Sequence, residues 1–100
     1  MSAKLIMYDI ADDKHRTKLA DLLLAWGFLR LQYSVFGGKH TPAQWQRCRK
    51  AIATLSKKYG DGTEKIMILN VSTQALKGMD CIGTKPDLSE MLNEKILLWI

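Results

Sequence analysis

The sequence predicts an α+β fold, in which an antiparallel sheet carries two helices on one face. Three strand-like segments stand at residues 5–9, 28–36 and 65–71. Two segments with the apolar spacing of helices, at about 12–26 and 41–59, lie between them. No composition shift, internal repeat or low-complexity stretch divides the 100 residues. We therefore expect one domain with one core.

The first segment, Leu-Ile-Met-Tyr-Asp, predicts a central strand that ends in a carboxylate. An apolar run such as Leu5-Ile6-Met7 is typical of a strand that is covered on both faces. Asp9 is the anomaly, because a carboxylate beside a buried strand is costly unless it is solvated, paired or bound to a metal. The residues alone leave two interpretations open: Asp9 has a functional role, or it caps a turn or pairs with Arg16.

The first helix is expected to begin at a cap supplied by Asp12 or Asp13 and to end near Trp26. Gly27 would then be the residue that follows the helix end. His15 projects with the buried stripe, where a lone histidine is a packed residue more often than a metal ligand. The stripe itself is formed by residues at helical spacing: Leu19, Leu22, Leu23 and Trp26.

Alternating residues over 28–36 predict a strand whose polar face includes Arg30 and Gln32. Gly37 and Gly38 permit a kink, after which a second, bent strand is expected to continue to about residue 39. Thr41, Pro42 and Gln44 then form the start of a second helix, which should run to about Tyr59. Its core stripe is expected to consist of Trp45, Cys48, Ile52, Leu55 and Tyr59. The outward side is basic: Arg47, Lys50, Lys57 and Lys58.

Residues 65–71 predict another strand, with a second buried run at 66–69. Residues 80–83 are expected to form a short strand, and 86–90 a helical turn. The apolar end, 96–100, is expected to add as a strand to a sheet edge of a second protomer, because an exposed apolar edge strand promotes aggregation.

The resulting order of elements is strand, helix, strand, bent strand, helix, strand, which is a ferredoxin-like βαββαβ arrangement. The uncovered face of such a sheet needs cover, so we expect a homodimer. Residues 1–100 form the single domain, in which 84–100 serve as a C-terminal extension with an extra strand for dimer or partner contacts. Cys48 and Cys81 lack the spacing of a zinc site and are expected to be buried free thiols.

Positive charge is concentrated in the middle of the chain, which carries +5 in total. Between Lys14 and Lys58 there are ten Lys or Arg and one acidic residue, Asp21. Such a block indicates a polyanionic partner, most often nucleic acid, and the alternative is a solvated helix surface that is basic by chance. No apolar run is long enough for a membrane span or a secretory leader, so we expect a cytoplasmic protein with no membrane contact.

Two motifs at this separation are specific. Tyr8-Asp9-Ile10 is followed by Asp12-Asp13-Lys14, and later by Gln32-Tyr33-Ser34-Val35-Phe36. Together they resemble the CRISPR-associated endoribonuclease family, the small adaptation proteins that bridge the CRISPR integrase, over residues 3–70. Gly38 departs from the pattern, because many members carry an acid there. The resemblance implies a ferredoxin-like homodimer, in which the aspartate that ends the first strand faces its copy across the two-fold axis.

The resemblance also implies site roles. Asp9 becomes the catalytic carboxylate and the ligand of Mg²⁺, an ion that suits hard oxygen donors. The implied nucleic-acid-binding residues are Tyr8, Lys14, Arg16, Lys18, Arg30 and Phe36. The implied function is CRISPR adaptation in antiviral defence and spacer acquisition, with cleavage of phosphodiester bonds in RNA or double-stranded DNA.

Two other functions stay open at this stage. The chain could act as a non-catalytic DNA-binding scaffold subunit of the CRISPR integrase complex, in which the basic helices carry the function. A third hypothesis is a ribonuclease toxin similar to virulence-associated protein D. A generic RNA-binding domain of this fold is disfavoured, because paired aromatic stacking motifs on the central strands are missing.

Overall fold

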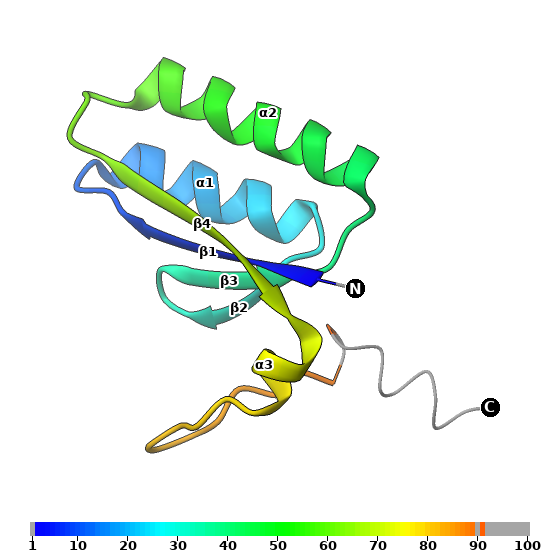
Figure 1. Cartoon of the computed structure of the whole chain (residues 1–100). Coiled ribbons are helices and arrows are strands. Elements are labelled where there is room, and N and C mark those ends of the chain that lie inside the picture. Colours follow the sequence, from blue (N-terminus) through cyan, green and yellow to red (C-terminus); the bar gives the residue numbers. More distant parts are fainter. Residues whose placement is uncertain (1, 90, 92–100) are drawn as a thin grey trace.

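The computed structural model describes residues 2–89 and 91 and confirms the predicted order of strands and helices (Figure 1). The elements are β1 (Ser2–Asp9), α1 (Asp13–Ala25), β2 (Leu29–Gln32), β3 (Val35–Gly38), α2 (Pro42–Tyr59), β4 (Lys65–Ser72) and α3 (Thr73–Lys77). The strands form one sheet in the order β2-β3-β1-β4, and every neighbouring pair is antiparallel. Helices α1 and α2 lie side by side on one face, which is the ferredoxin-like arrangement (Figure 1).

Both main helices begin where their capping residues predict. The Asp12 side chain accepts a hydrogen bond from the backbone N–H of His15, so Asp12 and not Asp13 is the cap of α1. At α2, the Thr41 hydroxyl accepts from the N–H of Gln44, and the Gln44 side chain accepts from the N–H of Thr41. This reciprocal capping box, followed by Pro42, determines the first turn of α2.

The main core lies between the two helices and the sheet. Phe36 is 0% exposed and stacks on Tyr8, with ring centroids 6.1 Å apart. Cys48 is also buried here, and burial raises the pKa of its thiol to about 11, so the thiol stays protonated and packs as an apolar group. Cys81 is only half-buried, which corrects the expectation that both thiols are enclosed.

His15 is packed in the core, as its place on the α1 stripe predicts, but its ring is costly there. The side chain is fully buried, and neither ring nitrogen has a hydrogen-bond partner in residues 2–89 and 91. A buried polar group without a partner loses its hydration without compensation. We expect His15→Leu to raise the free energy of unfolding by about 1 kcal/mol, measured by urea denaturation. A lower free energy would indicate that the ring makes a polar contact.

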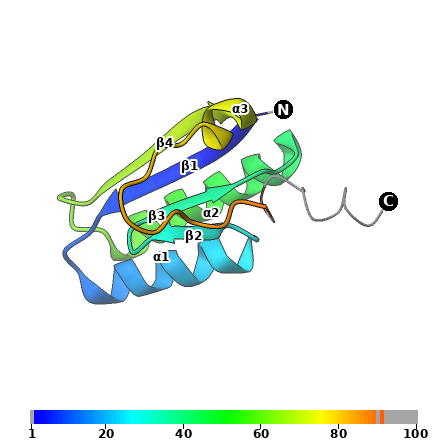
Figure 2. The same ribbon diagram turned by 90° about the horizontal axis from the view of Figure 1, so that it is seen from below.

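The opposite face of the sheet is covered at one end by the segment that follows α3 (Figure 2). Leu76, Leu88 and Met91 bury Ala3 there in a second, smaller cluster. The predicted strand at 80–83 is wrong, because the chain bends there and Gly83 adopts a φ of +97°. The predicted helical turn does not form at residues 86–88. Asp87 instead accepts hydrogen bonds from the backbone and hydroxyl of Ser89, which is a local turn.

Two further strand predictions need correction. The predicted continuous strand at 28–36 is interrupted by a turn at Tyr33 and Ser34, which makes β2 and β3 a hairpin. The run at 66–69 is not buried: Met67 is 56% exposed and Leu69 50%. The reason is that β4 is an edge strand, and within the described residues nothing covers its end of the open face. The predicted strand at 96–100 lies outside the described residues.

Candidate nucleic-acid interface

Asp9 lies at the exposed end of β1, the interior strand. Ile6 and Tyr8 point into the core under the helices, whereas Ala3 and Leu5 pack in the second cluster, so alternation places Asp9 on the open face. In residues 2–89 and 91, the side chain of Asp9 has no hydrogen bond or ion pair, while its backbone pairs with Lys65 of β4. The alternative that Asp9 pairs with Arg16 is therefore not what the structure shows.

Arg16 instead holds the loop that follows Asp9. Its Nη1 donates to the carbonyls of Ile10 and Ala11, at 2.9 and 3.3 Å, and its Nη2 donates to Asp13. The pKa of the guanidinium is raised above its usual value. The larger cause is the hydrogen bond to Asp13, and the second is a hydrogen bond to the Tyr33 side chain. Arg16 thus places a permanent positive charge at the end of the sheet where Asp9 lies.

Arg30 reaches the same end of the molecule through the β2–β3 turn. Its guanidinium lies 5.2 Å from the ring centroid of Tyr33 and 5.0 Å from that of Phe36, and its Nε donates to the Tyr33 carbonyl. The turn adjoins β1, because the N–H of Tyr8 donates to the carbonyl of Ser34. The structure thus brings Arg16, Arg30 and Asp9 to one end of the sheet, where Arg30, paired with the buried Phe36, lies on the helix side and Asp9 on the open face.

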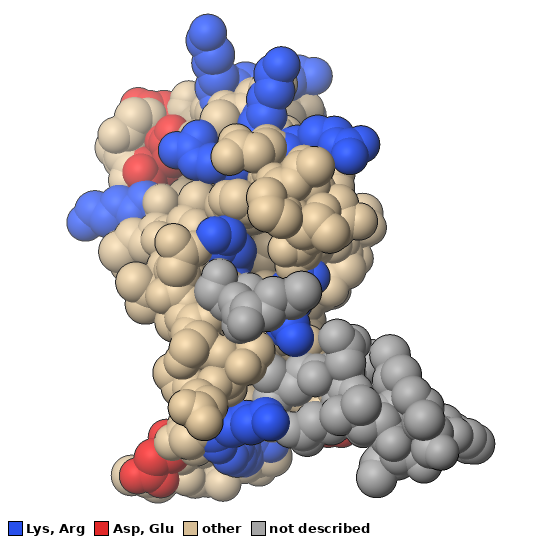
Figure 3. Space-filling model, turned by 45° about the vertical axis from the view of Figure 1, so that its right-hand side comes forward, with Lys and Arg blue, Asp and Glu red and all other residues tan. Residues whose placement is uncertain are grey.

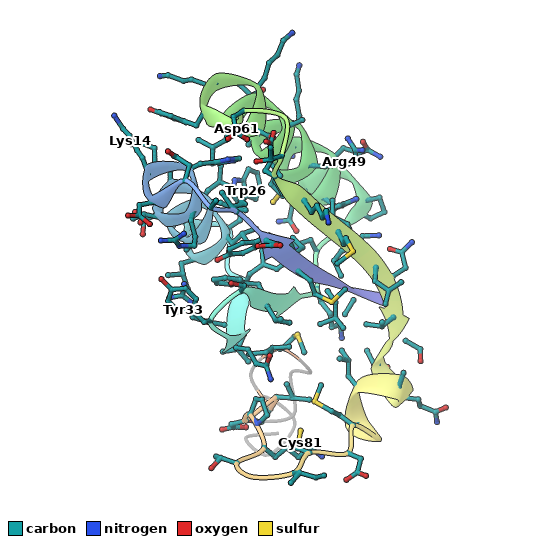
Figure 4. The ribbon with its side chains drawn as sticks, turned by 90° about the vertical axis from the view of Figure 1, so that its left-hand side faces the viewer. Lys14, Trp26, Tyr33, Arg49, Asp61 and Cys81 are labelled. Atoms are coloured by element: carbon teal, nitrogen blue, oxygen red, sulfur yellow. The ribbon has the colours of Figure 1, made fainter. Side chains whose placement is uncertain are left out.

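Tyr33 is a surface residue that sequence reasoning missed. Its ring is 69% exposed at the tip of the hairpin and projects from it, as Figure 4 shows. The alternation of apolar and polar residues continues through the turn, and Gly, Asn or Asp, which usually mark turns, are absent at 33–34. An exposed aromatic ring between two arginines is a suitable contact for a nucleotide base.

Tyr8 and Phe36 have a different role from the one predicted. Both rings are buried, and the Tyr8 hydroxyl donates to the Tyr33 carbonyl at 3.4 Å. A fully buried ring offers no surface to a nucleic acid, so the predicted contact from Phe36 is not available in this protomer. The two rings instead form the floor on which Arg30 and the hairpin turn rest.

Lys14 and Lys18 are nucleic-acid contacts in the prediction, but they do not lie with Arg16 and Arg30. Their ammonium groups lie 5.5 and 5.7 Å from the ring centroid of Tyr59, at the end of α2. Both side chains therefore belong to the helix layer, on the other side of the sheet from Asp9 (Lys14 in Figure 4). Sequence alone could not show this, because the position of α2 beside α1 decides it.

The described residues of one protomer provide few ligands for a metal ion. In the described part of the chain, His, Cys, Asp and Glu side chains do not form a group of three that could hold one. Asp9 is a hard oxygen donor, exposed and unpaired, which fits Mg²⁺ chemically but supplies one protein ligand. A site of this kind fits the chain if a second copy provides another carboxylate.

The fold and the site define a small ferredoxin-like domain with an exposed carboxylate, Asp9, and two arginines at one end of its sheet. The family model described as CRISPR associated protein Cas2 matches residues 1–79. The chain belongs to this family. The resemblance to the CRISPR-associated endoribonucleases is thereby confirmed, and it extends beyond residue 70.

Named relatives agree with this assignment. CRISPR-associated endoribonuclease Cas2 2 of Pyrobaculum aerophilum is 33% identical over 81 residues, which are 81% of this chain and 86% of the relative. CRISPR-associated endoribonuclease Cas2 3 of Synechocystis sp. is 35% identical over 81 residues, 81% of this chain and 84% of the relative. A chain of the partial Cas6-RT-Cas1–Cas2 complex matches with a TM-score of 0.72 and 29% identity, over 86% of this chain and 96% of that one.

The described helices include none that is long and apolar enough to cross a membrane.

Proposed function

We propose that this protein acts in CRISPR adaptation, in antiviral defence and spacer acquisition, as a homodimeric Mg²⁺-dependent endonuclease that hydrolyses phosphodiester bonds. The observation that carries the proposal is Asp9, whose side chain is exposed and, within the described residues, unpaired at the end of β1, the end of the sheet at which Arg16 and Arg30 are anchored. The names of the relatives, CRISPR-associated endoribonucleases, support the activity. Cleavage of single-stranded RNA and of duplex DNA by the wild type and by Asp9→Ala tests it.

The open face of the sheet supports the homodimer. Met67 and Leu69 are exposed on this face, opposite Met7 and Leu5 of β1 in the register of the sheet. Apolar side chains side by side on a sheet face favour association, because burial removes them from water. A two-fold pairing of these faces would also bring the two copies of Asp9 toward each other.

In such a dimer the two Asp9 carboxylates would both be ligands of one Mg²⁺. A bound ion supplies the Lewis acidity that polarises a phosphodiester and lowers the pKa of a water. Arg16 and Arg30 would bind the phosphate through the N–H groups that the loop and the hairpin leave free. Each arginine is already anchored to backbone carbonyls, so little conformational entropy is lost when phosphate binds.

The dimer can be tested at β4. We expect Leu69→Lys to shift the protein from dimer to monomer in sedimentation velocity, because it places a charge in the apolar patch. Leu24→Lys is the matched control: Leu24 is 49% exposed, against 50% for Leu69, but lies on α1 in the helix layer. A Leu69→Lys protein that stays dimeric at the concentration of the wild type would contradict the proposed face.

A second candidate function is a non-catalytic DNA-binding scaffold that works with the CRISPR integrase subunit. It is favoured by the helix layer, from which Lys and Arg side chains project (Figure 3), and by the similarity to a chain of the partial Cas6-RT-Cas1–Cas2 complex. In this hypothesis Asp9 is incidental, and Asp9→Ala would leave duplex binding and spacer integration intact.

A further inference from the structure

Two charged side chains of the described strands face the open side of the sheet, Asp9 from β1 and Lys65 from β4. Strand alternation places Lys65 on the same face as the exposed Met67. The other two charged residues of these strands, Lys4 and Arg30, lie over aromatic rings on the helix side. The open face is otherwise lined by apolar side chains, so its charge is concentrated at the end where Asp9 lies.

Asp9 and Lys65 are directly opposite each other in the sheet. They are register partners in the antiparallel pairing of β1 with β4, where the last residue of one strand meets the first residue of the other (Figure 1). Such partners have their side chains on the same face and their β-carbons about 5 Å apart. The ammonium group of Lys65 can therefore reach a ligand that is held by the Asp9 carboxylate.

The charge of Lys65 is not engaged by the described part of the chain. Its side chain is exposed, and within residues 2–89 and 91 it forms no ion pair, with Asp9 or with another acidic residue. An exposed ion pair across two strands would in any case stabilise the sheet only slightly. The described contacts leave this ammonium group available to an anionic ligand.

Charge balance at the proposed metal site requires a further cation. In the proposed dimer the two Asp9 carboxylates offset the charge of one Mg²⁺, so the negative charge of a bound phosphodiester has no partner among them. An uncompensated charge at an interface between apolar faces is costly. Arg30 lies on the helix side of the sheet. Among the described strands, Lys65 supplies the cationic side chain on the face that carries Asp9.

We propose that Lys65 is a phosphate-binding residue of the Asp9 site, whose ammonium group donates hydrogen bonds to a non-bridging oxygen of the phosphodiester that is cleaved. This inference rests on the proposed function, since it adds a residue to the same dimeric site. An ammonium group is a compact donor with three N–H bonds, which suits a phosphate oxygen. Because negative charge develops on these oxygens in the transition state, the contact assists the reaction step as well as binding.

The first test measures binding without metal, so that it does not depend on cleavage. In EDTA, Lys65→Gln should weaken the binding of a labelled single-stranded RNA by about tenfold at about 0.1 M salt. The slope of log affinity against log salt should fall by about 0.7 for each phosphate contact that is lost. Lys65→Arg keeps the charge and should retain most of the affinity.

Lys85→Gln is the matched control for binding. It removes the same charge from an exposed position in the segment that follows α3, outside the strands of the sheet. Its affinity for the RNA should equal that of the wild type. Equal losses in Lys65→Gln and Lys85→Gln would overturn the proposal, because net charge alone would then explain the effect.

The second test measures cleavage of the same RNA with Mg²⁺. Lys65→Gln should lower kcat/KM by roughly tenfold to a hundredfold, and Lys65→Arg should recover most of the loss. The Lys65→Gln protein should remain a dimer in sedimentation velocity. A monomeric Lys65→Gln protein would contradict the proposal and assign Lys65 to the dimer contact.

The two tests separate failure of this inference from failure of the proposed function. Wild-type binding and cleavage in Lys65→Gln, with Asp9→Ala inactive, would remove Lys65 from the site and leave the proposed function intact. Cleavage that survives in Asp9→Ala would instead reject the proposed function. The binding measurement in EDTA would then decide on Lys65 alone, since it requires neither metal nor cleavage.

Discussion

Asp9→Ala is expected to lower Mg²⁺-dependent phosphodiester cleavage by about a thousandfold. A bound divalent ion contributes several kcal/mol of transition-state stabilisation, and each loss of about 1.4 kcal/mol lowers the rate tenfold. In the proposed dimer each protomer supplies its Asp9 carboxylate, so the substitution would remove both protein ligands of the metal at once. Initial rates on single-stranded RNA and on duplex DNA, with Mg²⁺ and with EDTA, measure the effect.

Two controls make the result specific. Asp21→Ala removes an exposed carboxylate from α1, on the helix layer, and should cleave at the wild-type rate. Affinity for a duplex in EDTA should change little in Asp9→Ala, because the basic residues remain. Cleavage that survives in Asp9→Ala would exclude Asp9 from the mechanism. Wild-type protein without metal-dependent cleavage, but with tight duplex binding, would favour the scaffold.

Phe36→Ala is expected to lower the free energy of unfolding by about 3–5 kcal/mol, which approaches the whole stability of a small domain. The ring is fully buried beneath the helices, stacked on Tyr8 and covered at the edge by Arg30. Its removal leaves a cavity that the sheet and helices cannot close. Urea denaturation followed by circular dichroism measures the loss.

A milder change separates packing from recognition. Phe36→Leu keeps most of the volume and should cost roughly 1.5 kcal/mol or less, with unchanged affinity for nucleic acid. Tyr33→Ala should show the reverse, with little loss of stability and weaker binding, because its ring is exposed at the hairpin tip. Weaker binding by a stably folded Phe36→Leu protein would contradict the structural role and restore Phe36 to the interface.

Local chemistry determined the starts of the helices and the central strand. Each helix start is determined by a few neighbouring residues, because a capping side chain bonds backbone amides within three positions. These residues are Asp12 for α1, and Thr41, Pro42 and Gln44 for α2. Helical periodicity likewise placed His15 and Cys48 in the core. Asp9 was singled out by its chemistry and by the family resemblance, and the structure leaves its side chain exposed at the end of β1.

The faces that residues occupy depended on partners distant in the sequence. Met67 and Leu69 are apolar, yet exposed, because β4 lies at the sheet edge. Lys14 and Lys18 lie near Tyr59 rather than near Asp9 because α2 packs beside α1. Capping and periodicity act over one or two turns of chain, so the sequence alone determined the two long helices and the strand β1. Which surfaces meet is set by long-range packing, and only the tertiary structure decided that.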